Sequence, residues 1–493
     1  MPTDYDDVTT WLPDPSHYPE QMTPLSATVW FEAMGLGLQE ATRELRAPFA
    51  GFRTRTELGW AYEAELEPDW EPDPEAFRAA ALALPENWEQ ELLPRVREIT
   101  AEIDQMRPER ATPEQAQVLF DRLWELVQEQ WRLHFLTVIP AQAAANAFRD
   151  AYVEAFGDDD PVAPYRLLEG TPNPANDELQ ALADLARELD VADVVSEYDA
   201  AGVRTVLSQT ASGRRWLHAL DAYLLRYGGR SRWHELSLPR ESELPTLTLE
   251  SVRLALAEAA QRVPVAVNVP RALRDIAEPA RAAHALKELH SYEIDYPGLQ
   301  ATRDVLRAFG RRLAAEGTFD DPDDIWMLER QELRDALVGE LEPMHALVQT
   351  RRTELARGRE QGPRPFLGDP PAIADRHAIL ENFYGRAGTG LSGTPASHGN
   401  AEGTARVVCD ERDFARIEAG DVLVTTTTTP AWTPLFPSLA ALVTETGGIL
   451  SHAAVVAREY GLPAVVGVAD ATRLIPDGRR VRVDGGAGTV ALL

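Results

Sequence analysis

The spacing of apolar residues changes once along the chain, and this change constrains the fold more than any other feature. Between residues 25 and 360 apolar residues recur three and four positions apart, the spacing of amphipathic helices, at 28–46, 86–106, 113–135, 176–191, 248–262 and 299–316. Beyond residue 393 short β-branched runs replace this pattern, at 405–409, 421–426, 439–445, 464–468, 480–484 and 489–493. One helical stretch, 451–460, lies among them. The sequence therefore predicts a multidomain chain of the α plus α/β class.

The two patterns are separated by the segment richest in proline and glycine. It reads REQGPRPFLGDPPAIADR at 359–376 and RAGTGLSGTPASHGNAEGT at 386–404, a composition typical of linkers. We therefore predict a large all-α domain at 1–358, a linker and hinge at 359–392, and a small α/β domain at 393–493.

Composition excludes several classes of protein. No run approaches the eighteen or so apolar residues of a transmembrane helix, and the acidic N-terminus does not resemble a signal peptide. The single cysteine, Cys409, fits a reducing cytoplasm. The formal net charge of −31 repels nucleic acid and anionic membranes. We expect a cytoplasmic protein that binds neither.

The basic residues are almost all arginine, and the only lysine is Lys287. Phosphate-binding loops commonly place a lysine on the β- and γ-phosphates, in the pattern GxxxxGK[ST]. That pattern is absent from the sequence. We therefore expect that this chain alone does not bind ATP.

The segment TETGGILSHAAVVAREYGLPAVVGV, at 444–468, has the clearest local structure. A buried strand ends at Gly447 and the glycine after it, Ser451 is placed as an N-cap, and His452 opens the helix. Gly461 is placed to end it.

A histidine in the first turn of a helix lies beside unpaired backbone N–H groups and the positive end of the helix dipole. This position disfavours an imidazolium ion and favours a phosphate. Imidazole is a competent nucleophile, and its phosphoramidate can pass the group on. The alternative is a purely structural polar residue, but the whole segment favours chemistry. We therefore expect His452 to take up and transfer a phosphoryl group.

The same segment resembles the active-site segment of the swivelling phosphohistidine domain in the PEP-utilising dikinase superfamily, which includes pyruvate phosphate dikinase and phosphoenolpyruvate synthase. The resemblance covers 393–493, through GTPASHGNAEGTARVV, GDVLVTTTTTPAWTPLF and DGRRVRVDGGAGTV. The stretch TPAWTPLF is closest to rifampin phosphotransferases and to phenylphosphate and methylphenylphosphate synthases. Three further stretches resemble the substrate domain of rifampin phosphotransferases: SHYPEQMTPL at 16–25, YGGRSRWHELSLPRESELP at 227–245 and DDPDDIWMLERQELRDAL at 320–337.

The resemblance implies a dikinase-type phosphotransferase, with an acceptor domain at 1–358 and a carrier domain at 393–493. Relatives that bind ATP on the same chain carry an N-terminal ATP-grasp domain, whereas here the substrate-like region begins close to Met1. We therefore expect ATP and Mg²⁺ to be bound by a separate ATP-grasp subunit. The expected acceptor is a small hydroxyl compound, preferably a phenol, and the expected products are its phosphate ester, AMP and orthophosphate.

Two alternatives remain open at this point. One is an antibiotic-inactivating enzyme of the rifampin type, whose acceptor is a macrocycle. The other is a phosphohistidine carrier or regulatory protein, whose helical domain binds a protein partner.

Phosphoryl transfer needs positive charge around the moving group and a base for the acceptor hydroxyl. Because lysine is nearly absent, arginine has to supply the charge. The candidates for binding phosphate or substrate are Thr446, Arg230, Glu235, His17, Arg351 and Arg352.

Among these, Arg230 is the first choice for the charge, and Glu235 or His17 for the base. The alternative for each is an ion pair or a helix cap. His134 is expected to be a satisfied core histidine, and Arg458 to anchor its helix. No metal site is expected, because the carboxylates do not cluster with histidine or cysteine along the sequence.

Overall fold

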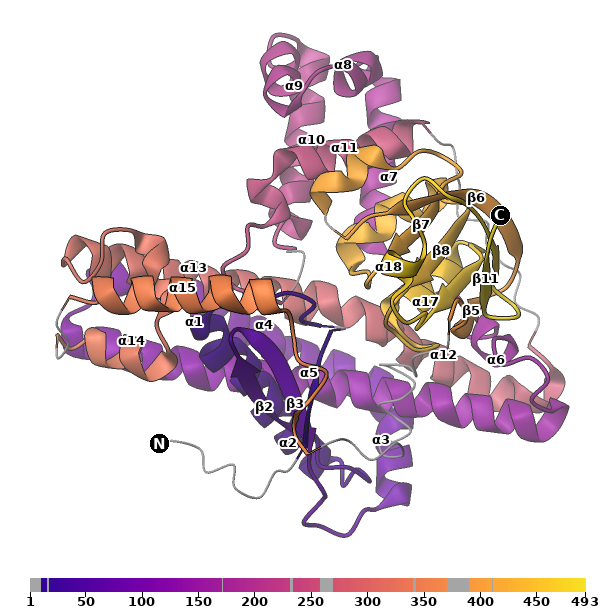
Figure 1. The fold of residues 1–493 in the computed structure, drawn as a ribbon, viewed down its shortest axis with the longest axis horizontal. Coiled ribbons are helices and arrows are strands. Elements are labelled where there is room, and N and C mark those ends of the chain that lie inside the picture. Colours follow the sequence, from indigo (N-terminus) through magenta and orange to yellow (C-terminus); the bar gives the residue numbers. More distant parts are fainter. Residues whose placement is uncertain are drawn as a thin grey trace. The chain divides into compact units, whose positions relative to one another are not determined.

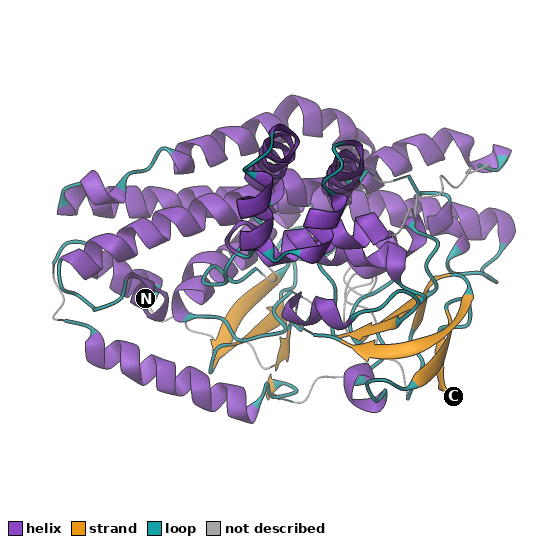
Figure 2. Ribbon diagram, turned by 90° about the horizontal axis from the view of Figure 1, so that it is seen from above, coloured by secondary structure: helices purple, strands orange, loops and turns teal. Residues whose placement is uncertain are grey.

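The structure is a computed structural model that describes residues 10–15, 17–170, 172–230, 234–257, 269–339, 343–369, 390–409 and 411–493. The chain divides into two compact units, each assembled from three segments. Unit 1 comprises 1–141, 233–238 and 290–377, and unit 2 comprises 142–232, 239–289 and 378–493. Helices account for most of the described chain (Figure 2). Among the described residues, no helix is both long enough and apolar enough to span a membrane.

Unit 1 is built mainly from helices whose apolar faces form its core. Its larger helices are α2 (Glu32–Glu44), α3 (Pro74–Asn87), α4 (Leu93–Asp104), the first part of α5 (Pro113–Phe156), α13 (Tyr296–Ala315), α14 (Arg330–Ala336) and α15 (His345–Gln361). Short π-helical turns, η1 (Ala27–Phe31), η2 (Trp88–Leu92) and η6 (Ser291–Asp295), lead directly into α2, α4 and α13. Phe120 of α5 and Phe309 of α13 are fully buried and meet edge to face, with ring centroids 5.8 Å apart.

Unit 1 also contains an antiparallel sheet, so the prediction of an all-α large domain is wrong. Among the described residues its strand order is β2-β3-β1-β4, with bounds β1 (Thr10–Pro13), β2 (Phe52–Glu57), β3 (Trp60–Glu65) and β4 (Leu367–Gly368). A two-residue turn joins β2 to β3, and Leu58 and Gly59 both have positive φ, as tight hairpins require. The sequence of β2, FRTRTE, contains one apolar residue. Its strand character is therefore invisible to an apolar pattern.

The part of unit 2 that precedes residue 290 consists of helices, two of which correspond to the predicted stretches 176–191 and 248–262. They are the end of α5, α6 (Ala163–Arg166), α7 (Pro174–Glu188), α8 (Ala192–Glu197), α9 (Ala200–Leu207), α10 (Ala211–Tyr227), α11 (Pro245–Ala257) and most of α12 (Arg274–His290). The side chains of Asn173, Asp199 and Thr210 cap α7, α9 and α10. The end of the predicted helix 248–262 lies outside the described residues.

The C-terminal part of unit 2 is a mixed sheet with helices on both faces (Figure 1). Its strands, in the order β11-β10-β6-β7-β8-β9-β5 among the described residues, include a parallel run from β6 to β9. Their bounds are β5 (Thr394–Ser397), β6 (Asn400–Val407), β7 (Val422–Thr425), β8 (Ala441–Thr444), β9 (Ala464–Val466), β10 (Arg480–Asp484) and β11 (Thr489–Leu492). Each predicted β-branched run coincides with one of these strands, which supports the α/β class. For residues 393–493 we keep the name carrier domain, which the resemblance suggests.

Alternation along the strands divides the core of the carrier domain into two layers. Leu423 and Leu442 pack with α17 (His452–Glu459) and the 3₁₀ segment η9 (Pro430–Ser438) on one face. Val422 and Val443 pack on the other face, towards α18 (Ala471–Leu474). Every residue of β7 and β8 is buried. The sheet therefore forms a rigid base for the loop after β8. Most of the predicted hinge, residues 370–389, lies outside the described residues.

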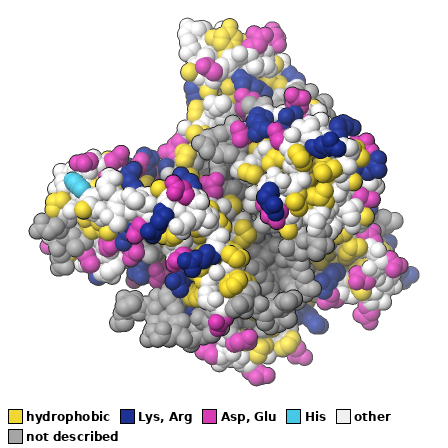
Figure 3. Space-filling model, viewed as in Figure 1, with side chains coloured by type: hydrophobic (Ala, Val, Ile, Leu, Met, Phe, Trp, Pro, Cys, Tyr) yellow, Lys and Arg dark blue, Asp and Glu magenta, His cyan; other side chains and the backbone are white. Residues whose placement is uncertain are grey.

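The surface carries many charged side chains of both signs. In the view of Figure 3, arginine and acidic side chains are interspersed over the visible face. Such mixing spreads the net charge of −31 over the molecule.

Candidate active site

The loop after β8 presents His452 at the start of α17, as the sequence predicts. Ser451 has extended backbone (φ −64°, ψ 158°), and its side chain accepts a hydrogen bond from the Ala454 amide at 3.4 Å. Gly447 has φ +104°, and a Cβ atom there would lie 2.8 Å from Ser451 Oγ. A side chain at position 447 would therefore displace the cap that starts the helix.

Both ring nitrogens of His452 have oxygen neighbours. Nδ1 lies 2.8 Å from Glu288 Oε2, on α12, and Nε2 lies 3.4 Å from Thr433 Oγ1, on η9. The side chains of His452 and Glu288 are 15% and 12% exposed. A carboxylate at Nδ1 favours a proton on that nitrogen, which places the lone pair on Nε2. The geometry thus prepares Nε2 as a nucleophile and leaves Thr433 as its nearest hydroxyl.

Two buried cations hold the backbone before His452. Lys287 donates from Nζ to the carbonyl oxygen of Leu450, and Arg458 donates to the carbonyl of Ile449 at 2.8 Å. Arg458 also donates to Ala396 in β5 at 2.9 Å, so it ties α17 to the sheet and to the loop. Burial lowers the pKa of Lys287 to about 8 and that of Arg458 to about 10. The anchoring role expected of Arg458 agrees with these contacts.

The candidates Thr446 and Arg230, both in unit 2, have structural partners. Thr446 donates its hydroxyl to the carbonyl of Thr426 at 3.1 Å and joins the ends of β7 and β8. Arg230 is buried, and its guanidinium lies 2.5 Å from the carboxylate of Glu241 and 2.5 Å from the Tyr223 hydroxyl. Glu241 therefore neutralises the positive charge of Arg230, which the sequence analysis assigned to phosphate binding.

The two candidate bases lie in unit 1. His17 pairs through Nδ1 with Asp14 at 2.8 Å. Glu235 is buried and accepts hydrogen bonds from the hydroxyls of Thr23 at 2.8 Å and Ser26 at 2.7 Å. Burial raises the pKa of Glu235, and these hydrogen bonds act in the opposite direction. Their role as a base remains a prediction.

Arg351 and Arg352, on α15 of unit 1, also have acidic partners. Arg351 donates to Glu332 at 2.9 Å and to the carbonyl of Met327 at 2.7 Å. Arg352 donates to Asp324 at 2.6 Å. Both arginines therefore stabilise the packing of α15, and their contribution to phosphate binding remains a prediction.

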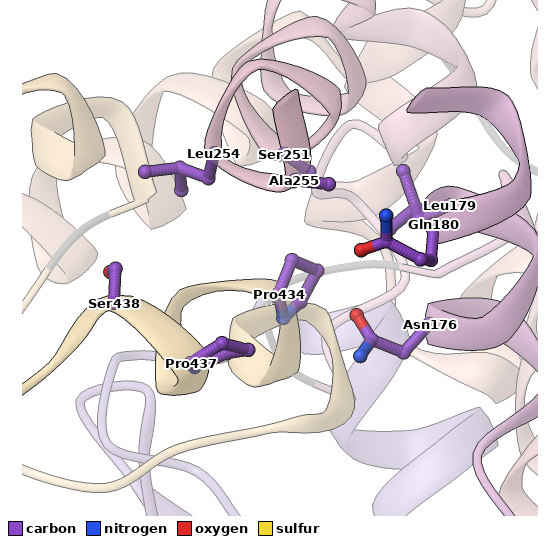
Figure 4. A pocket seen from close by; sticks show the side chains of 9 residues that line it. All are labelled: Asn176, Leu179, Gln180, Ser251, Leu254, Ala255, Pro434, Pro437 and Ser438. Atoms are coloured by element: carbon purple, nitrogen blue, oxygen red, sulfur yellow. The ribbon is translucent and has the colours of Figure 1, made fainter. Parts of the chain in front are cut away.

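Within unit 2 the carrier domain packs against α7 and α11 through η9. Figure 4 shows a small gap at this contact, about 30 Å³ in volume. Its lining is Asn176, Leu179 and Gln180 of α7, Ser251, Leu254 and Ala255 of α11, and Pro434, Pro437 and Ser438 of η9. This volume suits a water molecule or two and excludes an organic substrate.

A larger open cavity of about 710 Å³ lies beside Ile449, three residues before His452. It is lined by Arg149, Asp150, Val153, Glu154, Asp158, Pro161, Tyr165, Thr394 and Ile449. Three carboxylates and one guanidinium make this a charged surface. Val153, Pro161, Tyr165 and Ile449 give the same cavity an apolar part.

Comparison with known proteins shows which family contains the segment around His452. Residues 417–488, which include Thr433 and His452, match the family described as PEP-utilising enzyme, mobile domain. The chain is 34% identical to a rifampicin phosphotransferase of Streptomyces sviceus over 62% of its own length. It is 26% identical to an uncharacterised phosphotransferase of Bacillus subtilis over 79% of its length. The chain belongs to the PEP-utilising dikinase superfamily. The predicted membership, on the rifampin phosphotransferase branch, is thereby confirmed.

The superfamily relatives are longer than this chain. A chondramide synthase of Chondromyces crocatus is 31% identical over 98% of the chain, but the match spans 14% of that synthase. The chain spans 39% of the Streptomyces rifampicin phosphotransferase and 50% of the Bacillus phosphotransferase.

Sequence reasoning missed the two residues that contact the His452 ring, Glu288 and Thr433. Glu288 follows the only lysine of the chain, and Thr433 lies within TPAWTPLF. Both features stand out in the sequence, but neither indicates contact with His452.

Proposed function

We propose that this protein is a phosphotransferase that carries the phosphoryl group on Nε2 of His452. The observation that carries this proposal is the pairing of Nδ1 with Glu288 at 2.8 Å, in a histidine that opens α17. That pairing orients the ring and leaves the opposite nitrogen for attack. The phosphotransferase names of its relatives support the same reaction class.

The reaction takes two displacements at phosphorus. In the first, the Nε2 lone pair forms the P–N bond while the P–O bond to the donor breaks, and the donor oxygen leaves with the electron pair. The ring becomes positively charged, and the Glu288 carboxylate stabilises that charge through the Nδ1 proton. In the second, an acceptor hydroxyl oxygen attacks phosphorus and the P–N electron pair returns to Nε2. The hydroxyl proton leaves to a base.

We propose that ATP, with Mg²⁺, is the primary donor and is bound by a separate ATP-grasp subunit. With ATP, attack of Nε2 on the β-phosphorus releases AMP and leaves a pyrophosphoryl group on the ring. A further displacement follows before delivery, in which water attacks the terminal phosphorus, its P–O bond breaks and orthophosphate leaves. ATP, water and the acceptor alcohol together give the phosphate ester, AMP and orthophosphate. The absence of the GxxxxGK[ST] pattern and the single, buried lysine support this division. The proposed acceptor is a small phenol. A rifampicin-like macrocycle is the second candidate acceptor, because several relatives are named rifampicin phosphotransferase.

The proposal can be tested without the partner, using ammonium phosphoramidate as a chemical phosphoryl donor. We expect a phosphoryl group on His452 that is labile in acid and stable in base. Added phenol or rifampicin should then accept this group. Both steps are monitored by ³¹P NMR. The His452→Asn variant should transfer none. His345→Asn, at a histidine that is 45% exposed, is the matched control and should behave as wild type.

Each outcome decides between the alternatives. Transfer to phenol or rifampicin that persists in His452→Asn would contradict the proposal. A stable phosphohistidine that neither acceptor discharges would favour the carrier or regulatory protein.

A further inference from the structure

A second cluster of titratable side chains lies in unit 1. It contains His134 of α5, His290 at the end of α12 and Asp295 at the end of η6. One potential ligand atom from each lies within 4.8 Å of the others. The side chains of His134, His290 and Asp295 are 13%, 8% and 7% exposed. The cluster is therefore nearly enclosed by protein.

Both imidazoles converge on one carboxylate. His134 Nδ1 lies 2.7 Å from Asp295 Oδ1, and His290 Nε2 lies 3.3 Å from Asp295 Oδ2. The two rings meet edge to face, with their centroids 4.7 Å apart and an angle of 74° between their planes. Two imidazole nitrogens and one carboxylate form a ligand set that divalent transition metals bind, as in catalytic zinc sites that keep a fourth position open.

The backbone beneath this cluster is fixed. Gln130, buried on α5, donates to the carbonyl of Ile294 at 2.9 Å, next to Asp295. A Cβ atom at Gly298 would lie 1.5 Å from Gln130 Nε2, so α5 and α13 approach closely here. The π-helical turn η6 lies between His290 and α13. Such turns recur at functional sites because the extra residue redirects side chains.

The electrostatics of this interior suit a cation. Burial, and then the carboxylates Asp14, Glu63, Glu235 and Asp295, raise the pKa of Tyr18 well above its ordinary value. Acidic groups therefore concentrate in this part of unit 1.

One ring nitrogen is unsatisfied. His290 Nδ1 is buried and has no hydrogen-bond partner within the part of the chain that the structure describes. A buried polar atom without a partner costs free energy. Nε2 pairs with Asp295 and the ring contacts that of His134, so Nδ1 is the nitrogen left for a further ligand.

We propose that His134, His290 and Asp295 bind one divalent cation of the zinc class, with a fourth coordination position open. Tetrahedral zinc requires ligand atoms about 3.3 Å apart, so ligand atoms that now lie within 4.8 Å of one another have to draw together on binding. The expectation from sequence that no metal site exists rested on spacing along the chain. His134 and Asp295 are 161 positions apart in the sequence, so their proximity in the fold cannot be seen from spacing along the chain.

A proton relay is the competing interpretation, and the geometry favours the metal. A relay uses a carboxylate to orient one imidazole. Here each oxygen of the Asp295 carboxylate lies next to a different imidazole. Two imidazoles around one carboxylate suit a shared cation better than a path for a proton.

The test is calorimetric titration of untagged, chelator-treated full-length protein with Zn²⁺, and visible absorption after loading with Co²⁺. We expect one equivalent bound and the absorption bands of a four-coordinate Co²⁺ site. His134→Ala and His290→Ala should each weaken binding by at least about 100-fold, more than the loss of an outer hydrogen bond to a metal ligand. His345→Ala, also in unit 1, should leave binding unchanged.

Asp295→Asn is the conservative variant, and circular dichroism establishes that each variant is folded. It should bind Zn²⁺ more weakly while keeping the helical spectrum. Absence of stoichiometric binding by wild type, or equal binding by wild type and the His134, His290 and Asp295 variants, would overturn the proposal. The second of these outcomes would show that Zn²⁺ binds elsewhere on the acidic surface.

Discussion

Glu288 is the residue through which the chemistry of His452 can be examined without removing the nucleophile. Glu288→Gln keeps the shape and an acceptor for Nδ1–H but removes the negative charge. We expect phosphoryl uptake by His452 to fall about 10- to 100-fold, as when a partner of a functional histidine is lost. Glu278→Gln, at an exposed position of the same helix, is the control. Equal uptake rates in the two variants, measured by ³¹P NMR, would mean that Glu288 has no part in the reaction.

Lys287 gives a prediction about pH. Burial lowers its pKa to about 8, so the unfolded chain binds the proton more tightly than the folded chain. Between pH 8 and 10.5 the unfolded state holds more protons, and stability therefore rises with pH through this window. The penalty below pH 8 corresponds to roughly 3 kcal/mol.

Lys287→Met keeps the length of the side chain and removes the charge. We expect the melting temperature of wild type to rise relative to Lys287→Met as the pH increases from 8 to 10.5, measured by calorimetry. Parallel pH profiles for the two proteins would contradict this assignment.

For single residues, the sequence predicts features that depend on neighbouring positions and does not predict contacts between distant segments. The position of His452 at the start of α17 could be predicted because its cap, its glycines and its helix are contiguous. Glu288 lies 164 positions away, and no pattern within one chain joins the two. Arg230 was chosen for its charge, but its partner Glu241 comes from a turn eleven positions later. Pairing between segments decides whether an arginine is free to bind phosphate.

Among the elements, α17 gives the sharpest prediction. Ser451→Ala removes the cap at Ala454 N and should destabilise the carrier domain by about 1 kcal/mol. Ser451→Asp should retain the cap and the stability but slow phosphoryl uptake, because its negative charge repels the incoming phosphate. Thermal melts and uptake rates of the two variants separate these effects. A stable Ser451→Asp variant with the wild-type uptake rate would show that phosphate does not approach this end of the helix.

The elements that sequence predicted share a strong periodicity, and those that it missed do not. The buried strands of the carrier domain are runs such as VLVT in β7 and ALVT in β8, which signal themselves. In the unit 1 hairpin, β2 alternates arginine and threonine whereas β3 reads WAYEAE, and the tight turn at Leu58 and Gly59 joins the two. The strand β5 is four residues long and contains Pro395, which apolar patterns also overlook.

For the whole molecule, the separation of ATP binding from this chain is the prediction of widest reach. Calorimetric titration of the full chain with MgATP should give no binding at micromolar concentrations, because the phosphate-loop pattern is absent and the single lysine is buried. Micromolar binding would contradict the proposed ATP-grasp subunit and leave the role of His452 intact.

Composition predicts where a linker divides the chain, but it does not predict which segments contact one another. Sequence places a boundary in the proline- and glycine-rich stretch 359–392. Grouping by contacts places 142–232 and 239–289 with the carrier domain, because α7 and α11 contact η9. Contacts of this kind depend on how side chains of distant segments fit together, which periodicity does not encode.

Because Lys287 is the only lysine and contacts the Leu450 carbonyl, its chemical reactivity reports whether this contact is open or closed. A chain with one ε-amino group acquires one side-chain acyl group from an amine-selective ester, and a mass spectrum counts that modification directly. While the Lys287 amine is buried against the Leu450 carbonyl, acylation should be slow. Each departure of the carrier domain from α12 would expose the amine, so the acylation rate becomes a clock for that departure. Lys287→Arg supplies the blank, since a guanidinium does not react and only the terminal amine remains.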